Sequence, residues 1–597
     1  MGYNAEISQV ITGPGVNASS AQASTIGMMN LENSNRSGGD KKNSKTLRVL
    51  SVKGIKELIA QGHAIVIYGK YVLKLDKWIE RHPGGDKAIY HMIGRDAYDE
   101  MNSYHSPETI KHFKMFSIGV IDHRWINLLP PIQGGVYEGS DKTFEERLKQ
   151  GKLMSGEMSV RIKPKMPQGV IPQKGMNDLY KIVEPTPSNP IRDPEVVVDN
   201  FDNKMVKKDL ENLPPLDYET QWFISMKYNE LHDKLVKVGL FECPYIEYFK
   251  QFCINLSLFM WFLICFKTNH YFFSAVFLGF FWQQLVFIAH DAGHLAITHN
   301  YQIDNIIGTI IADWIGGLSL GWWKRNHNVH HLITNDPVHD PDIQHLPFFC
   351  VSTRLFGNLF STYYERFLWF DRIAQKLIPL QSYLYYPILA FGRFNLYRLS
   401  LEYLFKGQGP RKGKGAWFRW FELAGLGFFC WWFFYIVCGA LPTKMDRFQF
   451  IMVSHIATMV VHVQITLSHF AMSTSDLGTS ETFAARQLRT SMDVSCPEWF
   501  DFFHGGLQYQ AIHHMYPRMP RHNLRKAQKY VLEFCRDTGL KYSIYGFVNG
   551  NEKVLSKMDS VGRQVGIFRD CLKSMKMEDM NGKNMYEKKI AEIIKDD

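Results

Sequence analysis

The sequence is poor in cysteine, and its few cysteines are unsuited to cross-linking. Nine occur among 597 residues, the first is Cys243, and no two stand in a CxxC spacing. An odd number without paired spacing excludes a disulfide framework and a zinc ribbon. Cys253, Cys265, Cys430 and Cys438 lie in apolar runs, where cysteine behaves as a small buried hydrophobe. We therefore expect the chemistry of this chain to come from other side chains.

Two long segments lack apolar periodicity. Residues 1–46 are rich in Asn, Ser and Gly and have no apolar stretch, which predicts a disordered tail without a cleavable signal peptide. Residues 126–215 contain many Pro, Lys and Asp and predict a linker of limited structure. At the other end, residues 546–597 are expected to form a soluble extension. The net charge of +10 does not by itself indicate nucleic-acid binding, and we expect no such partner.

Charge is nearly absent from four stretches, which predict membrane-spanning helices. Each pair is joined by a short loop and predicts a helical hairpin that crosses the bilayer twice; the spans are 251–266 with 270–289, and 423–443 with 448–468. Residues 305–323 are also apolar but contain Asp313, and a charge at the bilayer centre costs about 3 kcal/mol. That segment, and the short apolar stretch 377–392, are predicted to be interfacial or re-entrant.

Histidine, by contrast, is abundant and clustered. Of 23 histidines, eight lie between His290 and His345 and seven between His455 and His522. Three clusters have i, i+3 or i, i+4 spacing, which places their side chains on one helix face; they are His290 with His294, then His327, His330 and His331, and finally Gln510, His513 and His514. Imidazole suits iron and other first-row metals. Seven histidines and one amide exceed the ligands of a single ion, so the spacing predicts two metal ions.

The predicted topology supports a shared site. Two crossings precede His290 and two separate His331 from Gln510, so all three clusters are expected on one side of the membrane. His469, at the near end of the fourth span, is a plausible further ligand, whereas His455 and His462 fit polar packing better. Second-layer acceptors that could orient the imidazoles are Asp291, Asn335 and Asp340.

Residues 47–125 have a different character and predict a small α+β module. A β-hairpin is expected around Gly69-Lys70, followed by short helices. His82-Pro83-Gly84-Gly85 places an imidazole on a tight turn, and His105 follows 23 residues later. Two imidazoles on opposite walls of an apolar slot would ligate a haem iron axially, and such a centre transfers electrons. His63, His91 and His112 are expected at the surface.

Residues 47–122 resemble cytochrome b5, and residues 218–545 resemble the membrane lipid desaturases with three histidine boxes. A fused cytochrome b5 and a third box beginning with Gln are typical of front-end desaturases. Three stretches are most similar to the fungal Δ8 sphingolipid desaturases: HDAGH at 290–294 with ITHN at 297–300, WWKRNHNVHH at 322–331, and HHMYPR at 513–518. In the third box Ala511-Ile512 replaces the commoner Ile-Glu pair, without changing a ligand position.

This resemblance implies a mostly α integral membrane desaturase fold over residues 216–545, with two transmembrane hairpins, a cytosolic di-iron domain and the α+β haem module at its N-terminus. It implies haem b on His82 and His105, two iron ions on the boxes, and O₂ as co-substrate. Electrons would come from NADH through NADH–cytochrome b5 reductase. The substrate would be the long-chain base of a ceramide or other sphingolipid, in the endoplasmic reticulum membrane with both cofactor sites facing the cytosol.

Three alternatives remain open from the sequence. A front-end fatty acid desaturase acting at Δ5 or Δ6 would place the new double bond in an acyl chain. A histidine-rich di-iron hydroxylase would add oxygen to the lipid instead of removing two hydrogens. A membrane-tethered haem electron carrier would bind haem but no second metal, and its remaining histidines would be structural.

Overall fold

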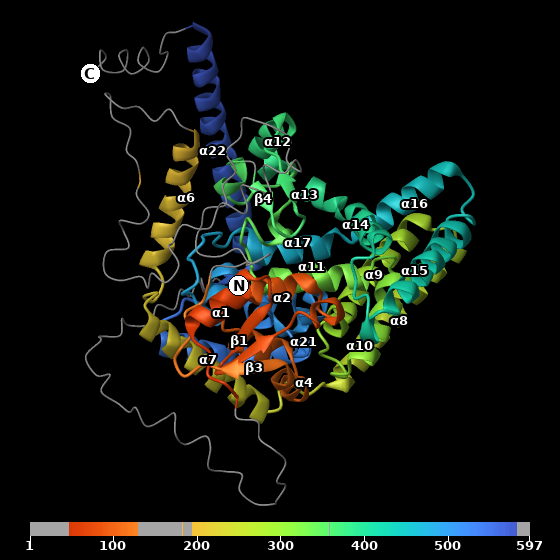
Figure 1. Ribbon diagram of the computed structural model, residues 1–597. Helices are drawn as coiled ribbons and strands as arrows, with labels where there is room; N and C mark the ends of the chain where they lie inside the picture. The colour runs from red at the N-terminus through yellow and green to blue at the C-terminus, as the bar shows by residue number, and fades with distance from the viewer. Residues whose placement is uncertain (1–46, 129–181, 183–193, 358, 582–597) are drawn as a thin grey trace, which may run out of the picture.

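The computed structural model describes residues 47–128, 182, 194–357 and 359–581 (Figure 1). The predicted tail 1–46 and most of the predicted linker lie outside these residues. Within them the chain is mostly helical, with a small N-terminal sheet and four helices long and apolar enough to span a membrane. The predicted fold class is confirmed.

The N-terminal module (residues 47–128) contains one antiparallel sheet of order β1-β2-β3. Its hairpin turns at Gly69, whose φ of 58° is the left-handed conformation that glycine adopts freely. The module's elements are α1 Val52–Ala60, β1 Ile65–Tyr68, β2 Tyr71–Lys74, α2 Asp86–Met92, α3 Tyr98–Tyr104, α4 Pro107–Phe113 and β3 Ser117–Val120. The predicted hairpin is thus found, with both strands in the module's apolar core.

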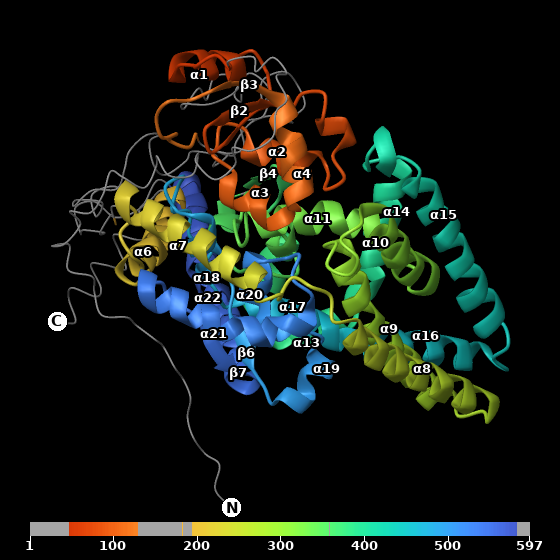
Figure 2. The ribbon, with the colours of Figure 1, turned by 90° about the horizontal axis from the view of Figure 1, so that it is seen from below.

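The module is packed directly against the rest of the protein. Leu332 and Ile333, from the end of α11 Leu320–Leu332 and just beyond it, belong to the same buried cluster as the module's own core. Figure 2 shows the module lying over α11, with α3 facing the centre of the molecule. The module's core is therefore completed by side chains that lie about 200 positions further along the chain.

The four candidate spans overlap the four predicted stretches, and the third is shifted toward the N-terminus, starting at Gly413 and ending at Val437 instead of residue 443. They are Tyr245–Lys267 (α8), Tyr271–Gly293 (α9), Gly413–Val437 (α15 Phe418–Phe429 continued by a π-helix Cys430–Val437), and Lys444–Phe470 (α16 Lys444–Ala457 and α17 Met459–Phe470). Phe252 and Trp261 on α8 and Trp431 on the π-helix are about half exposed, as expected of lipid-facing side chains. In Figure 1 these spans form one end of the molecule.

The apolar stretch around Asp313 is bent rather than straight. α10 Tyr301–Thr309 continues as a π-helix to Ile315 and then meets α11 at an angle of 116°. The Asp313 carboxylate, fully buried, accepts a hydrogen bond of 3.1 Å from the backbone N–H of Leu320 and so satisfies the start of α11. The bend is consistent with the predicted re-entrant segment. It turns the chain so that α11 packs against the N-terminal module. Residues 377–392 contain a short helical turn, Ile378–Leu380, followed by α13 Gln381–Ala390, and α14 begins at Gly392.

Parts of the predicted linker and of the predicted C-terminal extension form helices that pack on the main body. α6 Pro194–Glu211 lies inside the predicted linker, and its Val198 and Val206 are buried. α22 Phe547–Asn581 occupies most of the predicted extension; Val554 and Met558 are fully buried against α13 and α17. The two helices also contact each other. The prediction of limited structure is therefore wrong for residues 194–211, because these weakly amphipathic helices are stabilised by tertiary packing rather than by local pattern.

The remaining elements connect the spans to the centre of the molecule. β4 and β5 pair antiparallel, whereas β6 and β7 pair in parallel. The bounds are α7 Tyr218–Lys237, β4 Leu359–Ser361, β5 Arg366–Leu368, α12 Arg372–Leu377, α14 Gly392–Lys406, α18 Phe483–Thr490, β6 Asp493–Ser495, α19 Asp501–His504, α20 Gln510–Met515, α21 Arg521–Thr538 and β7 Ile544–Gly546.

Candidate metal centre and haem site

The three histidine clusters, far apart in the sequence, meet at one place. The end of α9 supplies the first, α11 the second and α20 the third. Ring centroids from different clusters lie 4.5 Å apart for His290 and His513 and 4.0 Å apart for His331 and His514. We call the assembled clusters, with His469, the histidine centre.

The histidine centre contains two groups of histidines. Within each group, the possible ligand atoms all lie within 4.8 Å of one another. Group A contains His290, His294, His327 and His513, and group B contains His330, His469 and His514. His469, expected as an additional ligand, falls in group B and is buried. Two groups match the two ions that the number of histidines predicts.

His331 and Gln510, also predicted as ligands, belong to neither group. The Nε2 atom of His331 lies 2.9 Å from Nε2 of His327, and its ring stacks on His514. The Gln510 amide donates to Nε2 of His514 at 3.2 Å, while its buried carbonyl oxygen has no hydrogen-bond partner among the described residues. Both side chains thus touch the centre, His331 between the groups and Gln510 at the edge of group B.

The donor atoms of the centre fit bound metal ions. In group B, Nδ1 of each ring faces outward, to Asp340 at 2.8 Å for His330, to Gln487 at 3.0 Å for His514 and to the Thr490 carbonyl at 3.3 Å for His469. The Nε2 atoms of His290, His294, His469 and His513 are buried without a hydrogen-bond partner among the described residues. A buried nitrogen without a partner is costly unless it binds a metal, and imidazole nitrogen suits iron.

Burial also keeps the ligand histidines in the neutral form that metal binding requires. It lowers the pKa of His327 to about 3, and burial together with the neighbouring rings holds the pKa of His294, His331, His513 and His514 well below the usual range. For His330, burial opposes protonation, but the carboxylates of Asp340 and Asp342 outweigh it and raise the pKa.

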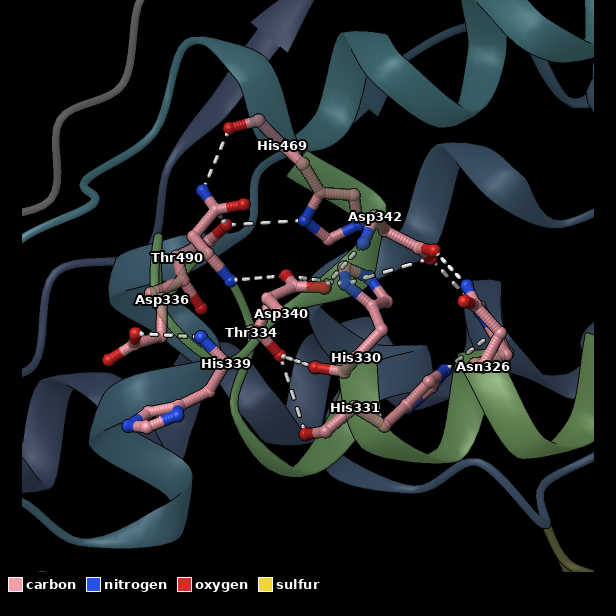
Figure 3. A network of polar contacts seen from close by, with 12 residues as sticks. Asn326, His330, His331, Thr334, Asp336, His339, Asp340, Asp342, His469 and Thr490 are labelled. Carbon is pink, nitrogen blue, oxygen red and sulfur yellow. Dashed lines mark hydrogen bonds and ion pairs between the residues drawn. The ribbon is translucent and has the colours of Figure 1, made fainter. Parts of the chain in front are cut away.

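Asp340 and Asn335 connect two of the ligand-bearing helices. Asp340 accepts from Nδ1 of His330 at 2.8 Å (Figure 3). It also accepts from the backbone N–H of Asn335 at 2.7 Å. The Asn335 amide donates to the backbone carbonyls of His469 at 2.9 Å and Thr490 at 3.2 Å. This pair therefore fixes α11 against the end of α17, the arrangement that group B needs.

Asp291 has a different environment from the one predicted. Its carboxylate lies 3.9 Å from Nδ1 of His290, beyond hydrogen-bond length, and instead pairs with Arg521 and accepts from Tyr248 at 2.5 Å. It joins α9 to α21 and α8 rather than orienting an imidazole. Asp342, which the sequence places in the same acidic stretch as Asp340, does lie at the centre: its carboxylate forms a third cluster with His327 and His330.

Replacing Asp340 by Asn is expected to lower iron affinity by about 10- to 100-fold, because Nδ1 of His330 loses its charged acceptor. Iron bound per protein after dialysis against graded chelator would measure this loss. Asp336→Asn is the matched control, because Asp336 lies in the same loop but caps only the backbone of Val338 and His339. Equal iron retention in the two variants would contradict the role given to Asp340.

In the N-terminal module, His82 and His105 face each other as predicted. Their ring centroids are 6.1 Å apart, and their Nδ1 atoms bond to backbone carbonyls, of Gly85 at 2.7 Å and Met101 at 3.0 Å. Metal–imidazole bonds of about 2 Å would place two such rings roughly 6 Å apart across an ion. Burial lowers the pKa of His105 to about 3. The residues present therefore fit a haem held by two neutral imidazoles.

The other histidines of the module divide between surface and interface. His112 is exposed, and His63 is partly exposed beside Asp76. His91 is fully buried, with its ring 5.4 Å from that of His339. Its predicted surface position is wrong because the docking of the module covers it, which helix periodicity within the module cannot show.

The turn that carries His82 is docked on the helix of the second histidine cluster. Asn328 donates to the Gly84 carbonyl at 3.2 Å, and Arg325 pairs with Asp86 at 3.1 Å. On the other side of the module, Ser103 bonds to the hydroxyl of Tyr228 at 2.5 Å. These contacts place the haem-ligand pair and the histidine centre on opposite sides of one short interface.

Comparison with known proteins agrees with both sites. Residues 268–546 match the fatty acid desaturase family, and residues 52–122 match the cytochrome b5-like haem/steroid binding domain. The chain is 59% identical over 546 residues to the Delta 8-(E)-sphingolipid desaturase of Komagataella phaffii, which covers 91% of this chain and 99% of that protein.

Two further relatives are less similar to this chain. Identity to the Delta 8-(E)-sphingolipid desaturase of Candida albicans is 53%, over 88% of this chain and 98% of that protein. It is 34% to the acyl-lipid (9-3)-desaturase of Borago officinalis, over 59% of this chain and 78% of that protein. With its four candidate membrane spans, histidine centre and N-terminal module, the chain is a multi-pass membrane oxidoreductase that belongs to the fatty acid desaturase family and carries a fused cytochrome b5-like domain.

Proposed function

We propose that this enzyme introduces a trans double bond at the Δ8 position of the long-chain base of a ceramide or related sphingolipid. The observation that carries the proposal is identity above 50% to the two fungal desaturases of this printed specificity over nearly their full lengths. The plant acyl-lipid desaturase is more distant and matches less of the chain. A fatty acid substrate is therefore the weaker alternative.

The reaction requires a metal oxidant, because no side-chain acid or base can remove hydrogen from an unactivated methylene. Two iron ions held by groups A and B, with His331 and Gln510 beside them, would supply that oxidising chemistry with O₂ as co-substrate. The chain's own part is to fix the ligand rings and to keep water from them. Trp323 packs against His327 at 4.5 Å and His290 at 5.2 Å, and a Cβ at Gly293 would come within 2.1 Å of its ring.

Electron delivery follows from the second site. We assign haem b to His82 and His105, and its electrons to NADH by way of NADH–cytochrome b5 reductase. The docking of the module against α11 supports direct delivery within one chain. The number of candidate spans between the sites supports an arrangement with both on one side of the bilayer, and we propose that this side faces the cytosol at the endoplasmic reticulum membrane.

The proposed domain boundaries are residues 47–125 for the haem module and residues 216–545 for the desaturase domain. The contacts of α6 and α22 with the main body support adding residues 194–211 and 547–581 to that domain.

The test is expression in a host that lacks sphingolipid unsaturation, followed by mass analysis of the hydrolysed long-chain bases. We expect a long-chain base lighter by two hydrogens, with the double bond at Δ8. Gain of one oxygen would instead identify a hydroxylase, and a new bond found only in acyl chains would identify a fatty acid desaturase. The empty vector and a His330→Ala variant are the controls.

A further inference from the structure

The haem-ligand pair and the histidine centre come closest at the end of α3. His105 follows Tyr104 directly, and the two rings have different partners: the His105 ring faces that of His82, while the Tyr104 ring contacts residues outside the module. Tyr104 meets His331 edge-on, with ring centroids 6.2 Å apart, and touches Phe483 at 6.3 Å on another side. One peptide unit and one ring contact therefore separate a haem ligand from the histidine centre.

His331 is well placed to distribute an electron between the two groups. Its ring lies 4.8 Å from those of His294 and His513 in group A, and it stacks on His514 of group B at 4.0 Å, with an interplanar angle of 9°. A side chain that contacts His331 is therefore one ring away from both groups.

Tyr104 is unsuited to losing a proton on the way. Its hydroxyl is buried and has no hydrogen-bond partner among the described residues. Oxidation of a phenol to a neutral radical needs a proton acceptor, which the surroundings do not offer. Any role of Tyr104 therefore belongs to its aromatic ring and not to its hydroxyl.

A second connection crosses the same interface but is longer. Asn328 donates to the carbonyl of Gly84, which lies two residues from His82, and Asn328 itself reaches group A only through the backbone of His327. This route runs through more saturated bonds and a 3.2 Å hydrogen bond. The route through Tyr104 contains one peptide unit followed by two aromatic rings in contact.

We propose that Tyr104 is the residue through which electrons pass from the haem module to the di-iron centre. The inference rests on the proposed function. For each double bond formed, the lipid loses two electrons and two protons. Reduction of O₂ to two waters needs four of each, so two more electrons must come through the haem and two more protons from solvent. The two electrons that O₂ needs in addition, supplied ultimately by NADH, would cross one at a time. Each transfer would oxidise the bound haem by one electron and reduce the metal centre by one electron, and Tyr104 would end unchanged.

The test is single-turnover reoxidation of the haem in the full-length holoenzyme in lipid nanodiscs. The haem is reduced under anaerobic conditions, mixed with O₂ in the presence of the lipid substrate, and followed by its absorbance. Tyr104→Leu is expected to slow reoxidation about tenfold or more, whereas Tyr104→Phe keeps the wild-type rate because the ring remains. The haem spectrum and the iron content should be unchanged in both.

Two controls separate conduction from packing. Phe483→Leu removes a ring that contacts Tyr104 but is not part of the contact between Tyr104 and His331, and it should keep the wild-type rate. If Tyr104→Leu loses haem or iron, Tyr104→Met, which is closer in volume to the ring, is judged in the same assay. A small soluble reductant should restore product formation in the slowed variant, because it bypasses the interface.

Wild-type reoxidation in a Tyr104 variant without a ring, or equal slowing by Phe483→Leu, would overturn the proposal. So would failure of the soluble reductant to restore product, which would show damage to the metal centre instead. An error in the proposed function would give a different result. A lipid other than a sphingolipid would then accelerate reoxidation, and the wild type and all variants would show the same change in lipid preference.

Discussion

His330→Ala is expected to reduce desaturation to below about one thousandth of the wild-type rate while leaving the haem spectrum intact. His330 is nearly fully buried in group B, and Asp340 fixes its Nδ1 so that the other nitrogen is free for a metal. Removing the ring leaves that group with two histidines, too few to hold an ion against exchange with water. The haem ligands lie in another module and do not depend on it.

The measurement is lipid product per haem in purified enzyme, with iron determined on the same sample. His299→Ala is the control, because His299 bonds only to backbone carbonyls and to Arg518 outside both groups. His331→Ala should also lose activity with haem preserved. Turnover by His330→Ala at a substantial fraction of wild type would rule out group B as an iron site and favour a haem carrier with structural histidines.

His82→Ala should abolish both the haem spectrum and NADH-dependent desaturation while iron content stays near wild type. His82 is one of the two facing rings that we assign to the haem, and its Nδ1 bonds to the Gly85 carbonyl at 2.7 Å. Because groups A and B lie on helices outside the module, their ligands remain in place. Optical spectroscopy, iron analysis and product formation on one preparation check all three expectations.

The control for His82 is His63→Ala, a partly exposed histidine of the same module that bonds to Asp76. Its haem and turnover should be unaffected. Full activity in haem-free His82→Ala would contradict the proposal by showing that a separate carrier supplies the electrons and that the fused module is dispensable.

The histidine centre was predictable because its information is local. The i, i+3 and i, i+4 spacings place each cluster on one helix face, and uncharged stretches fix the number of crossings between clusters. The partners of the rings were less predictable. Gln487 and Thr490, which orient His514 and His469, come from α18, a helix without any pattern that relates it to the clusters.

The module's interface shows a second limit. Nothing within residues 47–125 distinguishes His91 from a surface histidine, because the residues that bury it, among them His339, arrive from another domain. For the same reason the sequence alone does not reveal that Tyr104 contacts His331. The burial of α6 and α22 likewise depends on apolar partners far along the chain, which periodicity in a single sequence does not reveal.

The completion of the module's core by Leu332 and Ile333 makes the two cofactors thermodynamic partners. Haem binding favours the folded module, and the folded module packs against the end of α11. Because α11 carries three of the predicted iron ligands, this packing also fixes part of the metal centre. Linkage is reciprocal, so metal bound on α11 strengthens the haem pocket by the same free energy that haem contributes to the metal centre. Loss of one cofactor therefore lowers the stability of the other site without emptying it, and an enzyme that lacks either cofactor should unfold more readily than the complete form.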